Sequence, residues 1–154
     1  MPSSQPDLHY RPAHELVREL SDGTLTSEAV TQHFLDQIRR HNGSINAVVT
    51  LDEERALKNA RAADEKRAGG ASLGPLHGLP LTLKDTWEVA GMTCTAGAPA
   101  LRDYTPRHHA DVVQRLEDAG AIVVGKTNVP IYATDLQSYN KLFGVSNNPF
   151  NTDH

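Results

Sequence analysis

The stretch Gly74–Asp85, GPLHGLPLTLKD, ends in two charged residues, Lys84 and Asp85, directly after a short apolar run. Glycine and proline bound the run Leu81–Leu83, which is typical of a short buried strand. In α/β proteins, functional sites lie at the carboxyl ends of such strands. A lysine that is desolvated there loses its proton more easily and can act as a base. The alternative is that Lys84 is an ordinary solvated surface charge.

The segment Gly120–Thr127, GAIVVGKT, matches the phosphate-loop pattern letter by letter. A phosphate loop must follow a strand, surround an anion with backbone N–H groups and begin a helix. Here the middle residues are themselves apolar, a helical pattern precedes them, and Pro130 follows shortly. We therefore interpret Ala121–Val124 as a buried strand and Gly125–Thr127 as a turn that takes the chain out of the sheet.

The remaining reactive side chains give weaker indications of a site. Cys94, the only cysteine, can be a nucleophile if neighbouring charges lower its pKa, but a lone cysteine is more often a small buried hydrophobe. A single cysteine also excludes an internal disulfide. The eight histidines include one adjacent pair, His108 and His109, whose side chains diverge, and no spacing typical of metal ligands. The sequence therefore predicts no metal site.

Amphipathic helices are predicted before the lysine segment, over Ala13–Leu20, Ser27–His41 and Thr50–Ala68. Thr26 is expected to cap the second helix, and Asn42-Gly43 to end it. A short extended run, Ala47–Val49, separates it from the third helix. Thr50 is expected to begin that helix, because Glu53 follows at capping-box spacing.

A further helix, from about residue 109 to Gly120, lies between the strands predicted at Leu81–Leu83 and Ala121–Val124, with a short turn at Pro99–Leu101 before it. Strand, crossover helix and strand form a βαβ unit, which implies a parallel pair. The fold class is therefore α/β, in one domain. We expect a loose arm over 1–12, a helical lead-in over 13–70, and a strand, helix and strand core with the lysine site over 71–154.

The length and composition of the sequence exclude several classes of protein. A length of 154 residues allows one domain with a sizeable core. The net charge of −4 does not favour nucleic acid or an anionic membrane as partner. No apolar run is long enough to span a membrane, and the first residues contain no apolar stretch typical of a signal peptide. We therefore expect a cytoplasmic protein.

Several separate blocks occur in a distinctive order: GPLHGLPLTLKDTWEVAGMTCTAGAPAL, then HADVVQRLEDAGAIVVGKTNVP, then YNKLFGVSNNPFN. Together with INAVVT at Ile45–Thr50, they strongly resemble the N-terminal part of the amidase signature family, from about His14 to the end of the sequence. The resemblance implies a large mixed sheet covered by helices. It also implies hydrolysis of carboxylic amides, in some members with transfer of the released ammonia, and no cofactor.

The catalytic set of that family is a serine nucleophile, a second serine with a cis peptide bond, and a lysine. The resemblance places the lysine at Lys84. Neutral lysine there is expected to take the proton of the nucleophile through the second serine and pass it to the leaving amine. The resemblance also indicates five substrate-binding residues: Ala133, Thr134, Thr95, Ala96 and Gly97.

Both family serines lie in and before a glycine- and serine-rich loop downstream of the block matched by NNPFNTDH, where this sequence stops. Ser138 and Ser146 do not match their positions. We therefore expect an N-terminal fragment that is inactive alone. Its expected partners are a small-molecule amide and either the missing C-terminal half or a second copy of the chain.

Two alternatives to a free-standing amidase remain open. One is an ammonia-transferring amidotransferase subunit of the same family. The other is a non-catalytic module that binds a nucleotide or a partner. The block DLQSYNKLFG favours the simple amidases.

Overall fold

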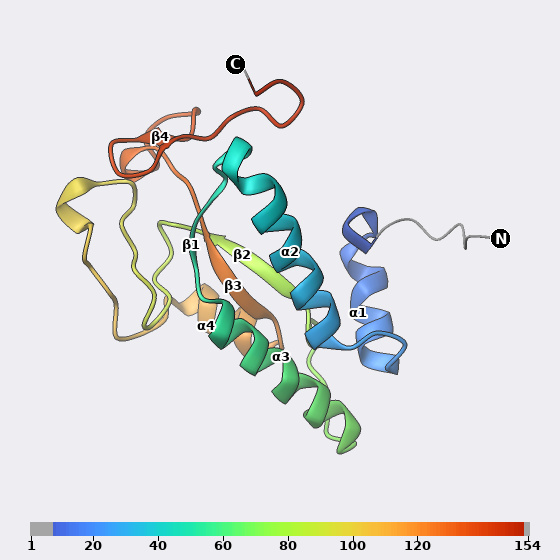
Figure 1. Cartoon of the computed structure of the whole chain (residues 1–154). Helices are drawn as coiled ribbons and strands as arrows, with labels where there is room; N and C mark the ends of the chain where they lie inside the picture. The colour runs from blue at the N-terminus through green and yellow to red at the C-terminus, as the bar shows by residue number, and fades with distance from the viewer. Residues whose placement is uncertain (1–7, 153–154) are drawn as a thin grey trace.

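A three-stranded mixed sheet lies at the centre of the structure, a computed structural model that describes residues 8–152 (Figure 1). Its strands are β1 (Val48–Leu51), β2 (Pro80–Lys84) and β3 (Ile122–Thr127), in the order β1-β3-β2. β2 and β3 run parallel and are joined through α4 (Asp111–Asp118), while β1 runs antiparallel to β3. The predicted βαβ unit and the α/β class are therefore confirmed.

Helices cover both faces of this sheet (Figure 1). The three before β2 are α1 (Ala13–Asp22), α2 (Ser27–Ile45) and α3 (Glu53–Ala68). On one face, α2 and α3 pack against Ile122 and Val124 of β3. On the other face, Val113 of α4 packs against Val123. Successive residues of a strand point to opposite faces, so the central strand supplies both apolar cores.

Shorter elements connect these layers: the 3-10 helices η1 (Leu8–Tyr10), η2 (Pro99–Leu101) and η3 (Ile131–Ala133), and the two-stranded pair β4 (Tyr139–Asn140) and β5 (Gly144–Val145). The turn predicted at Pro99–Leu101 is confirmed. The predicted loose arm falls partly on residues 1–7, which lie outside the described residues. No helix between residues 8 and 152 combines the length and apolar content that crossing a membrane requires.

The cap predicted at the start of α2 is confirmed, because the Thr26 hydroxyl accepts the Ala29 N–H at 3.2 Å. The predicted end of α2 at Asn42-Gly43 is wrong, since the helix continues to Ile45. Asn46 closes it in the left-handed conformation, with φ of 53°. The Asn42 side chain instead accepts the Val48 N–H at 2.8 Å, which joins the last turn of α2 to β1.

The predicted start of the third helix at Thr50 is also wrong. Thr50 lies in β1, where it pairs with Lys126 of β3, and α3 begins only at Glu53. Asp52 is the cap, and its carboxylate accepts the Arg55 N–H at 3.1 Å. Pairing with the central strand outweighed the local capping pattern. The segment predicted as a helical lead-in thus contributes one strand to the sheet.

The turn predicted at Gly125–Thr127 is wrong for the same reason. β3 continues through Thr127 and is hydrogen-bonded on both sides, to β1 and to β2. A backbone that is paired on both sides cannot leave the sheet. β2 also extends one residue beyond each end of the predicted strand Leu81–Leu83.

Candidate active site

Lys84 lies at the carboxyl end of β2, where its backbone pairs with Thr127 of β3. Its side chain is exposed, and among the described residues no hydrogen bond or ion pair engages it. Leu83 packs in the layer under α4, so strand alternation places Lys84 and Thr82 on the opposite face. The structure thus presents the predicted base as a free side chain at a strand end.

The residue after Lys84 belongs to a buried polar cluster, consisting of Asp85, Thr95 and Lys126. The Lys126 ammonium donates to Asp85 Oδ1 at 3.1 Å, and the two side chains are 0% and 1% exposed. Asp85 Oδ2 accepts from the N–H of Thr95 at 3.1 Å and from its hydroxyl. Sequence reasoning missed this cluster, although opposite charges at the ends of two adjacent parallel strands are a signal for it.

An irregularity in the strand pairing aims Lys126 into this cluster. Strict alternation would place Lys126 on the same face as Ile122 and Val124, which contact α2 and α3. The register shifts by one residue, however, so that Leu81 pairs with Val123 and Thr82 pairs with Gly125. A bulge of this kind changes which face the following residues occupy. Lys126 therefore pairs with Leu83 and shares the face of Asp85.

Cys94 is 5% exposed, and its thiol contacts the backbone oxygen of Asp85 at 3.6 Å. Burial raises the pKa of this thiol above its ordinary value, although the nearby charge of Lys126 acts in the opposite direction. A nucleophilic cysteine needs a lowered pKa. The structure therefore agrees with a small buried hydrophobe rather than a nucleophile.

The two predicted substrate segments, Thr95–Gly97 and Ala133–Thr134, lie close together through the backbone. The carbonyl of Ala96 accepts the N–H of Tyr132 at 2.7 Å, and the N–H of Ala96 donates to the carbonyl of Asp85 at 2.9 Å. Thr95 and Gly97 are buried, whereas Ala133 and Thr134 are exposed. The fold thus connects both segments to the end of β2, although they are far apart in the sequence.

Left-handed backbone conformations gather in these same segments. Ala96, Tyr132 and Ala133 have φ values of 48°, 50° and 56°, and Asn46 at the end of α2 is the one further non-glycine case in residues 8–152. Such conformations cost free energy and cluster at functional sites. This observation is independent of any sequence resemblance, and it supports the interpretation of the two segments as parts of a site.

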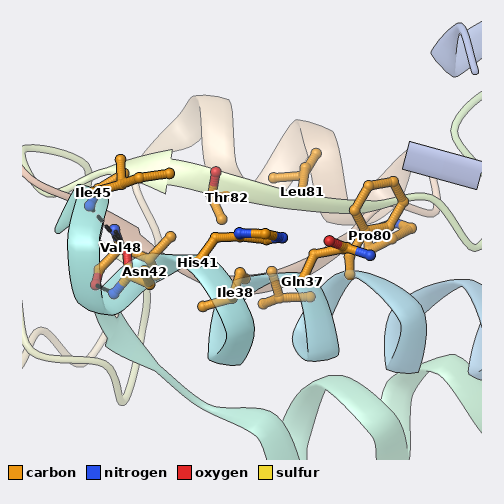
Figure 2. A pocket seen from close by; sticks show the side chains of 12 residues that line it. Gln37, Ile38, His41, Asn42, Ile45, Val48, Pro80, Leu81 and Thr82 are labelled. Carbon is orange, nitrogen blue, oxygen red and sulfur yellow. Dashed lines mark hydrogen bonds between the residues drawn. The ribbon is translucent and has the colours of Figure 1, made fainter. Parts of the chain in front are cut away.

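One cavity lies along β2, and a second adjoins the Thr95–Gly97 loop. An open, largely apolar groove of about 620 Å³ separates α2 from β2; Figure 2 shows Gln37 and His41 projecting from α2 toward Leu81 and Thr82. A second cavity of about 360 Å³ adjoins the Thr95–Gly97 loop and is lined by Thr50, Thr93, Thr95, Arg102, Leu142 and Phe143. Sequence reasoning predicted neither cavity, because each is formed by segments that are distant in the chain.

Among the described residues, no group of histidine, cysteine and acidic side chains is arranged to hold a metal ion. His109 lies 3.5 Å from Glu117 and pairs with it only when protonated. Within residues 8–152, no histidine side chain hydrogen-bonds to the cluster of Asp85, Thr95 and Lys126, while His41 lines the groove between α2 and β2.

The sequence is similar to one protein family and to individual proteins of known name. A family model described as Amidase matches residues 29–154. The chain is 37% identical over 147 residues to a glutamyl-tRNA(Gln) amidotransferase subunit of Moorella thermoacetica, covering 96% of this chain and 30% of that protein. It is 40% identical over 138 residues to the corresponding subunit of an Azoarcus species, covering 90% of this chain and 28% of that protein.

Solved structures are similar as well. The native peptide amidase from Stenotrophomonas maltophilia superimposes with a TM-score of 0.88 at 33% identity, over 96% of this chain and 32% of that chain. A bacterial aryl acylamidase of the amidase signature family superimposes with a TM-score of 0.89 at 26% identity, over 96% of this chain and 31% of that chain. The chain thus spans less than a third of the length of the relatives that it matches.

Proposed function

The chain belongs to the amidase signature family, and on that premise we propose that it forms the lysine-bearing part of an active site that hydrolyses carboxylic amides. One observation supports this above the others. The side chain of Lys84 is free at the end of β2, and the next residue, Asp85, is hydrogen-bonded through its backbone to a loop that is left-handed at Ala96 and joined to the left-handed Tyr132. A free base next to strained loops is an arrangement suited to catalysis rather than to stability.

In this proposal Lys84 acts as a general base and then as a general acid. A serine hydroxyl is a weak nucleophile until a positioned base removes its proton. Lys84, in its neutral form, accepts that proton by way of a second serine as the hydroxyl oxygen attacks the amide carbon. It then returns the proton to the amine nitrogen as the C–N bond breaks. Water releases the acid from the serine, and neither metal nor cofactor takes part.

The exposure of Lys84 sets a condition on this chemistry. Lysine becomes an effective base near neutral pH only when burial disfavours its charged form. We therefore propose that activity needs further residues that cover Lys84, equivalent to the part of the relatives that this chain does not match. Those residues would also supply the serines and the oxyanion hole.

Ser138 and Ser146, which do not match the positions of the family serines, do not replace the catalytic serines. The Ser146 hydroxyl donates to the Asn46 carbonyl at 2.7 Å and accepts from the Asn128 amide at 3.0 Å, which fixes it in a structural role. Ser138 does not match the position of either family serine, and its carbonyl accepts the Ser146 N–H at 2.8 Å. We propose that the 154-residue chain alone does not hydrolyse amides.

The test joins residues 1–154 to the remaining part of the Stenotrophomonas peptide amidase and measures ammonia or amine release from a panel of amides. We expect Lys84→Ala to lower kcat at least about a thousandfold with a smaller effect on KM, because proton transfer acts mainly in the transition state. Lys141→Ala, which removes another exposed lysine, is the control and should keep full activity. Robust turnover by the unextended chain, or by Lys84→Ala, would contradict the proposal.

The names of the curated relatives favour one second candidate, an amidotransferase subunit that delivers ammonia to a glutamyl-tRNA. This alternative brings a nucleic-acid partner, which the net charge of −4 does not favour. A joined enzyme that transfers ammonia to a glutamyl-tRNA, and releases none from simple aliphatic or aromatic amides, would replace the first candidate with the second. A cytoplasmic location fits either candidate and stays a prediction of the sequence.

A further inference from the structure

The buried ion pair between Lys126 and Asp85 has no role in the proposed reaction. Its side chains are 0% and 1% exposed and lie 3.1 Å apart. Desolvating two charges is costly, and apolar residues of similar volume would join the strand ends at least as firmly. Removing one partner would leave the other charge buried and uncompensated. Stability alone is therefore a weak reason for the pair.

The contacts of Asp85 indicate a more specific role. Lys126 occupies Oδ1, and the N–H and hydroxyl of Thr95 occupy Oδ2. The Asp85 N–H donates to the carbonyl of Thr127 at 3.1 Å, and its carbonyl accepts the Ala96 N–H at 2.9 Å. One residue thereby connects the end of β2, the end of β3 and the Thr95–Gly97 loop.

The Thr95–Gly97 loop is in turn connected by hydrogen bonds to the second substrate segment. Thr95 Oγ1 accepts the Gly97 N–H at 3.0 Å, and the Ala96 carbonyl accepts the Tyr132 N–H at 2.7 Å. Ala96 and Tyr132 both have positive φ, a conformation that persists only where surrounding contacts impose it. Asp85 makes one of the contacts that hold Ala96, since its carbonyl accepts the Ala96 N–H.

We infer that Asp85 and Lys126 are positioning residues of the amide-hydrolysing site, an inference that rests on the function proposed above. Lys126 fixes the orientation of the Asp85 carboxylate. Asp85 then holds the Thr95–Gly97 loop against the strand end that presents Lys84, which sets the base in register with the substrate segment. Small displacements of a reacting group are costly in turnover, so the pair should affect kcat more than KM.

The first test uses the 154-residue chain and its single thiol. Cys94 is buried beside Asp85 and is alkylated only when the loop opens. We expect Asp85→Asn and Lys126→Met each to accelerate alkylation by iodoacetamide at least about tenfold, because each leaves one charge unpaired. Loss of the Lys126 charge by itself would raise the pKa of Cys94 and slow alkylation, so acceleration in Lys126→Met reports opening. Loss of the Asp85 charge by itself would lower that pKa and speed alkylation, so Lys126→Met is the deciding variant. Lys141→Met is the matched control, with no change expected.

The second test separates positioning from packing. The double variant Asp85→Asn/Lys126→Met has no unpaired charge, so we expect it to regain most of the protection of Cys94. In the joined enzyme it should nevertheless stay at least about tenfold below the parent in kcat, with KM changed by less than about threefold. Turnover should not recover, because the double variant has neither the carboxylate of Asp85 nor the ion pair that fixes its orientation in the parent.

Two outcomes would overturn the inference. In one, both single variants protect Cys94 as the parent chain does. In the other, the double variant recovers turnover together with protection, which would show a packing role only. The inference and the proposed function fail separately: full activity of Lys84→Ala removes the function, while alkylation still decides whether the pair holds the loop.

Discussion

His77, in the turn before β2, is 2% exposed, and its Nε2 atom has no hydrogen-bond partner in the part of the chain that the structure describes. Burial lowers the pKa of this imidazole below its ordinary value of 6.5. The charges of Lys66 and Arg67 act in the same direction, and that of Asp64 opposes them. The folded chain therefore holds His77 neutral at a pH where the unfolded chain protonates it.

A pH dependence of stability follows from this difference. The contribution of His77 is fully present above pH 6.5, and it is lost as the pH falls from there through the lowered pKa of the folded state. We expect the free energy of unfolding to decline from pH 7 to pH 5, by at most about 1.4 kcal/mol per pH unit from this residue. Denaturant unfolding followed by the fluorescence of Trp87, the only tryptophan, measures it.

The matched variants for this prediction are His77→Gln and His14→Gln. His77→Gln should flatten the decline between pH 6.5 and 5, because glutamine does not titrate. His14 is exposed on α1, so His14→Gln should leave the slope as it is. Equal slopes in both variants and the parent would show that His77 is not the group responsible.

At the scale of elements, the close approach of β1 to β3 depends on Gly125. A Cβ at this position would lie 2.4 Å from the Thr50 carbonyl oxygen and 2.9 Å from the Leu51 side chain. The first of these contacts is with backbone, which cannot move without unpairing the strands. We expect Gly125→Ala to destabilise the fold by about 1–3 kcal/mol, the usual cost of overpacking.

Gly43 provides the control for this prediction. It lies inside α2, and a Cβ there would meet nothing within 4 Å. Alanine favours a helix interior over glycine, so Gly43→Ala should stabilise the chain by up to about 1 kcal/mol. The same unfolding assay compares the two variants. A neutral Gly125→Ala beside a stabilising Gly43→Ala would mean that β1 does not need this close contact.

β3 also explains why the phosphate-loop pattern at Gly120–Thr127 should not bind nucleotides. The middle of the pattern is strand, and Lys126, which would have to reach the phosphates, is fully buried against Asp85. We expect calorimetric titration with ATP or GTP and magnesium to show no saturable binding tighter than about millimolar. Binding that is abolished by Lys126→Ala and kept by Lys141→Ala would refute this.

At the scale of the whole molecule, much apolar surface is uncovered. β2 pairs only with β3 among the described strands, and the groove of about 620 Å³ lies beside it. Leu136 and Phe150 are 104% and 97% exposed. Open strand edges and apolar patches favour association. We expect the isolated chain to form oligomers or to be poorly soluble, as measured by size-exclusion chromatography with light scattering.

The open edge of β2 can be tested directly. A charge on an edge strand opposes pairing with another strand, so Thr82→Lys should shift the chain toward monomer. Thr24→Lys adds the same charge at an exposed position outside the sheet and should not. A monodisperse parent chain that unfolds cooperatively would argue against the view that this edge is covered in the active protein.

Local patterns were enough to predict much of the fold and part of the site. Periodicity placed the helices, and the turn residues around Leu81–Leu83 placed Lys84 at a strand end, because these features depend on neighbours within a few residues. The family resemblance added the roles of Lys84 and of the two loops. Those roles belong to the function proposed above.

Other features depend on contacts between distant segments, and here local patterns misled. Thr50 has the spacing of a helix cap, yet it pairs with β3, and Gly125–Thr127 has the composition of a turn, yet it lies in the central strand. In both cases sheet hydrogen bonds outweighed the local preference.

The Asp85–Lys126 pair shows most clearly the difference between features that local patterns predict and features that depend on distant contacts. The sequence displays each charge after an apolar run, but 41 residues separate them. Their meeting requires the parallel pairing of β2 with β3, and also the one-residue shift that moves Lys126 to the face of Asp85. The sequence by itself thus determined the elements and the strand end that presents Lys84. Only the tertiary structure decided which lysine is free and which is buried in an ion pair, because strand register is set by the packing of the whole sheet.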